Sequence, residues 1–277
     1  MTGLDVAREV WGSLGLTPDR AMKALTRFFL ILIAFAFARP AAQALPDAAA
    51  TAGRLILRHN ADAVVAVKAT VILKVTMDDH YVPPQENKVD ILGTVIAPTG
   101  LTVASLSSID PRALFEVFRS KMQGGGSGLQ LGQTEFNDIK LRFGDGTEVA
   151  AKIVWRDADR DLAFLAPTGT PGRTYAFVNL GDAPAGAVVL ADYYEVSRMP
   201  EGLLRAAVVR PATVIGIIER PRRLFLVDTE GLGCPIFDPQ GHVLGIMLHF
   251  MTKGVPSGNA VVPAGDIADS ASQISQL

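Results

Sequence analysis

The chain has 277 residues, 49% hydrophobic and 19% charged, so it can bury a core and is not intrinsically disordered. Its formal net charge of −2 at pH 7 provides no long-range attraction for nucleic acid, so we expect no such partner. The single cysteine, Cys234, excludes an intrachain disulfide and any metal site built from several cysteines. No metal-ligand spacing is present among the histidines, so neither a metal nor a cofactor is expected: His59, His80, His242 and His249.

The first 44 residues have the features of an extension followed by an export signal. A short basic segment, Met22–Arg27, precedes an apolar run at Phe28–Ala38 that is shorter than the roughly 20 residues of a membrane span. Small residues at Ala42–Ala44 occupy the positions that a signal peptidase recognises, so cleavage after Ala44 is predicted. We expect a periplasmic or secreted bacterial protein, with a membrane as partner only if this signal stays uncleaved. Translation from Met22 is an alternative start.

The next part of the chain alternates short β-rich segments with turns. A small-residue linker is predicted at Pro46–Ala52 and a polar loop at Asp78–Lys88. Segments rich in β-branched residues, or with alternating hydrophobicity, predict these strands: Ala63–Val75, Asp90–Ala97, Leu101–Ser105, Asp138–Phe143, Val149–Trp155 and Leu162–Leu165.

Between Asp110 and Asn137 the pattern changes. Asp110 is a plausible N-cap, and Pro111–Met122 predicts a helix. Gly124–Gly128 then predicts a flexible loop. A phosphate-binding role for this loop is disfavoured because no Lys-Ser/Thr pair follows it.

The second half also consists of short strands separated by Gly and Pro turns, and the tail Asp266–Gln276 has a helical pattern. The predicted strands are Ala187–Ala191, Ala206–Val209, Thr213–Ile218, Leu224–Val227, a short one before the turn at Asp238–Gly241, Val243–Leu248 and Asn259–Val262. Many short strands at this spacing indicate an all-β fold, either a sandwich or a pair of barrels.

One loop in this half has the form that displays a single side chain at a sharp bend. In Val227–Ile246, Leu232 stands between Gly231 and Gly233, which allow positive φ. Hydrolases use such bends to present a nucleophile and to direct backbone N–H groups at an oxyanion. Leucine has no nucleophilic atom.

Five regions in order resemble a trypsin-like (chymotrypsin-fold, peptidase S1-type) serine protease domain, and HtrA-like bacterial periplasmic proteases most closely. They are Gly93–Ala97 with Gly100–Ile109, Phe143–Thr147 with Asp159–Leu165, Leu180–Asp182, Val227–Ile246 and Asn259–Pro263. The resemblance implies two packed six-stranded β-barrels, at 45–170 and 171–277. The first would carry the inserted helix and Gly-rich loop at 110–137, and a short C-terminal helix would follow the second.

The same resemblance implies a degenerate catalytic triad. The family's His falls on Ser107, its Asp on Asp161 and its Ser on Leu232. Leucine cannot attack a carbonyl, and a serine hydroxyl cannot act as a base at neutral pH. A remnant of the oxyanion loop is expected at Gly231, Gly233 and Cys234, although the run before Leu232 is shorter than in the family.

The sequence therefore favours an exported pseudo-protease that binds a protein or peptide in the cleft between its barrels. The alternative is an active serine-type endopeptidase with a non-standard site, for which Cys234 is the one candidate nucleophile. Pro235 follows it and lacks an N–H group. A cluster of arginines suggests either a site for an acidic partner or anionic membrane, or a solvated face: Arg205, Arg210, Arg220, Arg222 and Arg223.

Overall fold

The computed structural model of the chain describes residues 47–77, 80–110, 112, 129–131, 134–169, 172–184 and 186–274. The expected export signal and cleavage site lie outside these residues, and so does the predicted helix Pro111–Met122 apart from Arg112. Gly124–Gly128 is also outside them. Within the described ranges, no helix is long and apolar enough to cross a membrane.

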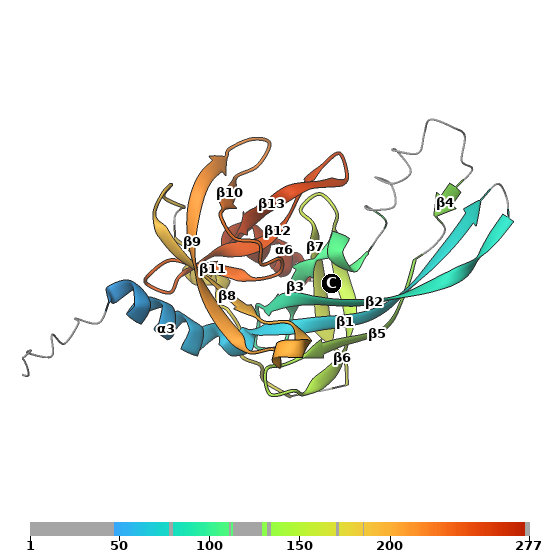
Figure 1. Ribbon diagram of the computed structural model, residues 1–277, viewed down its shortest axis with the longest axis horizontal. Helices are drawn as coiled ribbons and strands as arrows, with labels where there is room; N and C mark the ends of the chain where they lie inside the picture. Colours follow the sequence, from blue (N-terminus) through green and yellow to red (C-terminus); the bar gives the residue numbers. More distant parts are fainter. Residues whose placement is uncertain are drawn as a thin grey trace, which may run out of the picture. The chain divides into compact units, whose positions relative to one another are not determined.

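The first half of the described chain forms a closed antiparallel barrel in the strand order β2-β3-β7-β6-β5-β1, and β1 pairs back onto β2. Beyond the barrel, β1 and β2 continue as a long hairpin, to which β4 (Leu129–Leu131) adds on the β1 side (Figure 1). The barrel strands are β1 (Val64–Met77), β2 (His80–Val95), β3 (Thr102–Ser105), β5 (Glu135–Arg142), β6 (Glu148–Asp157) and β7 (Leu162–Pro167).

The second half forms another closed barrel in the order β10-β13-β12-β11-β8-β9. Its strands are β8 (Asp192–Arg198), β9 (Ala207–Ile218), β10 (Leu224–Val227), β11 (Pro235–Phe237), β12 (Val243–Thr252) and β13 (Val255–Pro263). A C-terminal helix, α6 (Ala264–Ile274), follows β13. The prediction of two six-stranded barrels and a short final helix is confirmed.

Strand β1 begins with four consecutive apolar residues, Val64–Val67, because both of its faces are covered there. Val65 and Val67 point into a core cluster of the first barrel, whereas Val64 belongs to a cluster shared with the second barrel. That shared cluster also contains Phe164 of β7 and Phe237 of β11, all fully or almost fully buried. The two barrels therefore pack through a common apolar core, which fixes the position of the loops between them.

Helix α3 (Ala48–Asn60) occupies most of the segment predicted as a linker, so that prediction is wrong from Ala48 onward. The helix packs against β8 and β9, and the Tyr194 hydroxyl donates a hydrogen bond of 2.9 Å to the Ala49 carbonyl. Its small residues serve close packing, because a side chain on Gly53 would meet the Tyr194 ring at 3.2 Å.

One strand prediction and one loop prediction are also corrected. Ala187–Ala191 is not a strand: Val188 and Leu190 are 65% and 77% exposed, and Leu190 has a φ of +65°. The strand in this region is β8. Its sequence looks like that of an exposed segment, because its buried residues Glu195 and Arg198 are charged and form hydrogen bonds inside the protein. In the first barrel, the described part of the predicted loop Asp78–Lys88 continues strand β2.

Candidate functional site

Asp161 lies at the turn between β6 and β7 and is only 1% exposed. Its φ of +58° is a left-handed conformation, which aspartate tolerates better than most residues. The carboxylate accepts three hydrogen bonds, from Ser105 Oγ at 2.6 Å, Ser107 N–H at 2.7 Å and His249 N–H at 3.0 Å. These bonds stabilise a buried charge that would otherwise be strongly unfavourable.

Ser107 and Asp161 are therefore brought together, but through the serine backbone rather than its side chain. Among the described residues, the Ser107 hydroxyl is buried and has no hydrogen-bond partner. Ser105 caps the short helix α4 (Leu106–Ile109), accepting from Ser108 N–H at 3.3 Å and from Ser108 Oγ at 2.8 Å. The groups around the carboxylate are thus hydroxyl and amide donors, none of which can take up a proton at neutral pH.

Leu232 sits on the loop between β10 and β11, and its side chain packs against the apolar cluster inside the second barrel. The following residue joins this loop to the first barrel. Gly233 has a φ of +77°, its carbonyl accepts from Thr94 Oγ1 at 2.7 Å, and a Cβ placed on it would lie 2.0 Å from the Leu92 carbonyl oxygen. Only glycine fits this contact with β2.

Consecutive backbone N–H groups of this loop all have acceptors within the protein. The bonds are Gly231 N to Glu195 Oε2 (3.1 Å), Leu232 N to Glu230 O (2.8 Å), Gly233 N to Met247 O (2.8 Å) and Cys234 N to Gly231 O (3.0 Å). An oxyanion hole needs N–H groups that point into open space toward a substrate oxygen. In this conformation, the N–H groups at the expected remnant oxyanion loop are already occupied.

Glu195 is the residue that shapes this loop, and no sequence pattern marks it as a functional or structural residue. It is fully buried, yet its carboxylate accepts hydrogen bonds from the Thr229 hydroxyl and Gly231 N–H. Arg210 completes the group with an ion pair of 3.0 Å. A Cβ on Gly231 would overlap the Glu195 carboxylate at 2.5 Å, so the glycine is required by this contact rather than by a bend.

Cys234, the alternative nucleophile, is fully buried in the cluster shared by the two barrels. Its thiol lies 3.4 Å from Ser197 Oγ. Burial raises the pKa of the Cys234 thiol to about 12, so the group stays protonated at neutral pH. It is placed as a small apolar residue in the core.

We expect Cys234 to be unreactive toward Ellman's reagent at pH 8 in the folded protein. Both burial and the raised pKa lower the supply of accessible thiolate, since the thiol is protonated at every pH below about 12. The reagent should titrate the thiol only after guanidinium unfolding. Rapid labelling of the folded chain at the unfolded rate would contradict this placement.

Neither His249 nor His242 is arranged as a general base for this site. His249 N–H contacts Asp161, but its ring Nδ1 lies 3.0 Å from Asn259 Oδ1. His242 is half-exposed at a hairpin turn, where Nδ1 lies 2.9 Å from Asp238 Oδ2. In the described part of the chain, no three His, Cys, Asp or Glu residues gather as a metal site would require.

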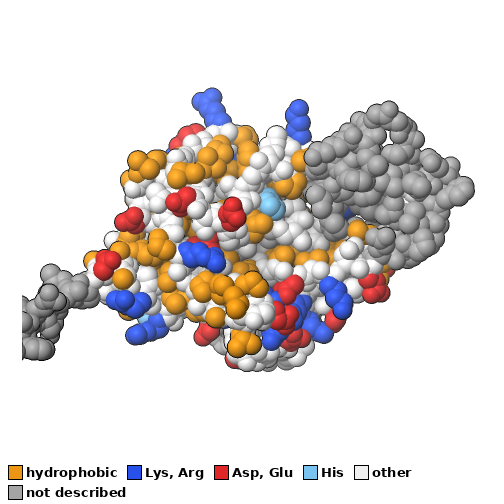
Figure 2. Space-filling model, viewed as in Figure 1, with side chains coloured by type: hydrophobic (Ala, Val, Ile, Leu, Met, Phe, Trp, Pro, Cys, Tyr) orange, Lys and Arg blue, Asp and Glu red, His pale blue; other side chains and the backbone are white. Residues whose placement is uncertain are grey.

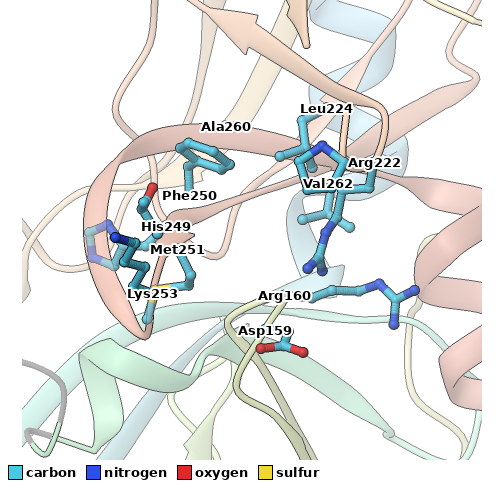
Figure 3. A pocket seen from close by; sticks show the side chains of 12 residues that line it. Asp159, Arg160, Arg222, Leu224, His249, Phe250, Met251, Lys253, Ala260 and Val262 are labelled. Carbon is cyan, nitrogen blue, oxygen red and sulfur yellow. The ribbon is translucent and has the colours of Figure 1, made fainter. Parts of the chain in front are cut away.

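A cavity of about 220 Å³ lies between the turn before β7 and the β12–β13 hairpin, and its lining includes Arg160, the residue next to Asp161 in the chain. The turn before β7 contributes Asp159 and Arg160 on one side, and Arg222 extends toward them from the β9–β10 turn (Figure 3). On its other side are His249 and Lys253 of the β12–β13 hairpin.

Comparison with known proteins places this arrangement in a family. Residues 91–246, more than half of the chain, match the trypsin-like peptidase domain. A search of curated proteins finds no match.

Solved structures with the same fold include three proteases. Deg5 is 19% identical with a TM-score of 0.52, covering 79% of this chain and 91% of its own. The active form of the Rv3671c protease from M. tuberculosis is 19% identical with a TM-score of 0.51, covering 81% and 86%. A variant of the HtrA-type protease AlgW with a tripeptide is 14% identical with a TM-score of 0.52, covering 80% and 63%. At these identities the likeness establishes the fold.

Proposed function

Because the chain belongs to the trypsin-like peptidase family, we propose that it is a catalytically inactive member that acts as a protein-binding or regulatory module. The observation that carries this proposal is the state of the loop around Leu232. The position expected for the nucleophile holds a partly buried leucine side chain that packs against the core cluster of the second barrel, and the neighbouring N–H groups donate to internal acceptors. Neither attack on a carbonyl nor stabilisation of an oxyanion is supported by this geometry.

Asp161 supports the same proposal, because its partners give it a structural task. Its carboxylate holds the end of β3 and strand β12 together through Ser105, Ser107 and His249. A catalytic aspartate instead orients an imidazole that takes up the nucleophile's proton. We infer that Asp161 stabilises the junction between the barrels, where a partner would bind.

Hydrolysis of fluorescently labelled, unfolded casein by the purified full chain tests this proposal. We expect no release of fluorescence above that of a buffer control over hours. A Cys234→Ala variant serves as the contamination control. Hydrolysis that the wild type and this variant share equally points to a contaminant or to a site without the cysteine, and inhibition by a fluorophosphonate bound to this chain then distinguishes the two. Activity attributable to this chain would reject the proposal in favour of an endopeptidase with a non-standard site.

We further propose that the chain acts outside the cytoplasm, as the basic segment and apolar run before Ala44 suggest. N-terminal sequencing of the protein recovered from a bacterial periplasm should begin at Leu45. A chain that retains Met22 in the cytoplasmic fraction would contradict export.

A further inference from the structure

In the lining of the cavity next to the β6–β7 turn, basic side chains outnumber acidic ones. Its lining contains Arg160, Arg222 and Lys253 against a single acid, Asp159. Within the described residues, neither Arg222 nor Lys253 makes an ion pair with an acidic side chain, and Arg160 Nε is buried without a hydrogen-bond partner. Arg160 is held in place by its other end, through an ion pair of 2.8 Å between Nη1 and Asp157.

The contrast with the other arginines of the sequence cluster is informative. Three of the other four are paired: Arg205 with Asp90, Arg210 with the buried Glu195, and Arg223 with Glu219 at 3.3 Å. No ion pair of Arg220 is seen in the described part of the chain, and Arg220 does not line the cavity. On the visible face of the molecule, basic and acidic side chains are accordingly interspersed (Figure 2). Arg222 differs because it lines a cavity together with two further cations.

Like charges that converge from separate loops repel one another unless an anion lies between them. Figure 3 shows the Arg222 guanidinium directed toward the Arg160 side chain, although the two residues come from different barrels. A carboxylate at this point would be an acceptor for the Arg222 guanidinium, and charge-assisted bonds of this kind are strong.

The remaining walls are apolar. Leu224, Phe250, Ala260 and Val262 contribute to the lining, and the exposed area of the cavity is mainly hydrophobic. At about 30 Å³ per water molecule, a volume of about 220 Å³ corresponds to on the order of seven non-hydrogen atoms. This matches one acidic side chain with part of an apolar neighbour and is too small for a cofactor.

We propose that this pocket binds a glutamate or aspartate side chain of an extended peptide segment, with an adjacent apolar residue against Phe250. The inference rests on the proposed function, because it names the chemistry of the partner that the inactive scaffold would bind. Selectivity for the partner then comes from Arg222, Arg160 and Lys253, and net positive charge at the pocket favours acidic over basic segments.

The test is calorimetric titration of the full chain at about 0.15 M ionic strength, where exposed charges are screened, with three capped hexapeptides. They alternate valine with glutamate, glutamine or lysine. We expect the glutamate peptide to bind at least about tenfold more tightly than the glutamine peptide, as loss of one charge-assisted bond implies. The lysine peptide should bind more weakly still.

Two single substitutions make the location of the site testable. Arg222→Gln should weaken binding of the glutamate peptide about tenfold and leave the glutamine peptide unchanged. Arg223→Gln removes the same charge from the neighbouring residue, outside the pocket, and should change the affinity less than about twofold because exposed charges are screened. Both sites are partly or fully exposed, so folding should survive, which circular dichroism can verify.

Equal affinity for the glutamate and glutamine peptides would overturn the proposal, and so would equal effects of the two substitutions. Absence of measurable binding of any peptide at millimolar concentration also counts against it. The peptide titration and the casein assay test the two proposals separately. A chain that cleaves casein but prefers the glutamate peptide rejects the inactive scaffold alone, whereas an inert chain without that preference rejects the pocket alone.

Discussion

Replacing Asp161 with alanine is expected to lower the free energy of unfolding by about 4 kcal/mol. The variant leaves the partly buried N–H groups of Ser107 and His249 without their acceptor, at about 1–3 kcal/mol each. Alanine also tolerates a φ of +58° less well than aspartate, which adds about 1 kcal/mol. Urea denaturation monitored by circular dichroism provides the measurement.

The neighbouring Asp159→Ala is a matched control, since Asp159 is exposed and no side-chain hydrogen bond or ion pair is seen for it within the described chain. It should change stability by less than about 0.5 kcal/mol. Asp161→Asn should fall between the two, because asparagine tolerates the left-handed backbone and keeps one acceptor oxygen. Equal stabilities of the two alanine variants would show that the Asp161 bonds contribute nothing to the fold.

Gly233→Ala is expected to cost about 3 kcal/mol or more, and to detach the loop around Leu232 from strand β2. The new Cβ would lie 2.0 Å from the Leu92 carbonyl oxygen, a backbone atom that cannot move without disturbing the pairing of β2 with β1. The left-handed φ contributes a further penalty of about 1–2 kcal/mol.

Gly254→Ala separates these two causes, because Gly254 has the same φ of +77° but nothing within 4 Å of its Cβ position. This control should lose only the conformational part, about 1–2 kcal/mol in chemical denaturation. If Gly233→Ala proved no more destabilising than Gly254→Ala, the loop would not be clamped against the first barrel.

The fold was largely predictable because most strands either alternate apolar and polar residues or are rich in β-branched residues. These are the patterns of strands buried on one face or on both. Leu224–Val227 was predicted with the bounds that the structure gives to β10. Strand β8 could not be found this way, since its buried members Glu195 and Arg198 look like surface residues. Their burial depends on partners far along the chain, Gly231 and Val64 among them.

The candidate site was predictable only in its residue identities. Ser107 and Asp161 were expected together and do contact each other, but the sequence could not show that the contact uses the Ser107 backbone. Whether the loop N–H groups have internal hydrogen-bond acceptors depends on how the peptide units are oriented. Side-chain patterns do not encode that orientation. The link from Glu195 to Gly231 is likewise tertiary.

A last measurement tests the central claim, that this site lacks both a nucleophile and a usable oxyanion hole. The wild-type chain and a Leu232→Ser variant are incubated with a fluorescent fluorophosphonate and compared by gel and mass spectrometry. We predict no covalent labelling of either, because a hydroxyl restored at position 232 has no base beside it and the neighbouring N–H groups donate internally. Stoichiometric labelling of the wild type, or of the variant at position 232, would contradict the account.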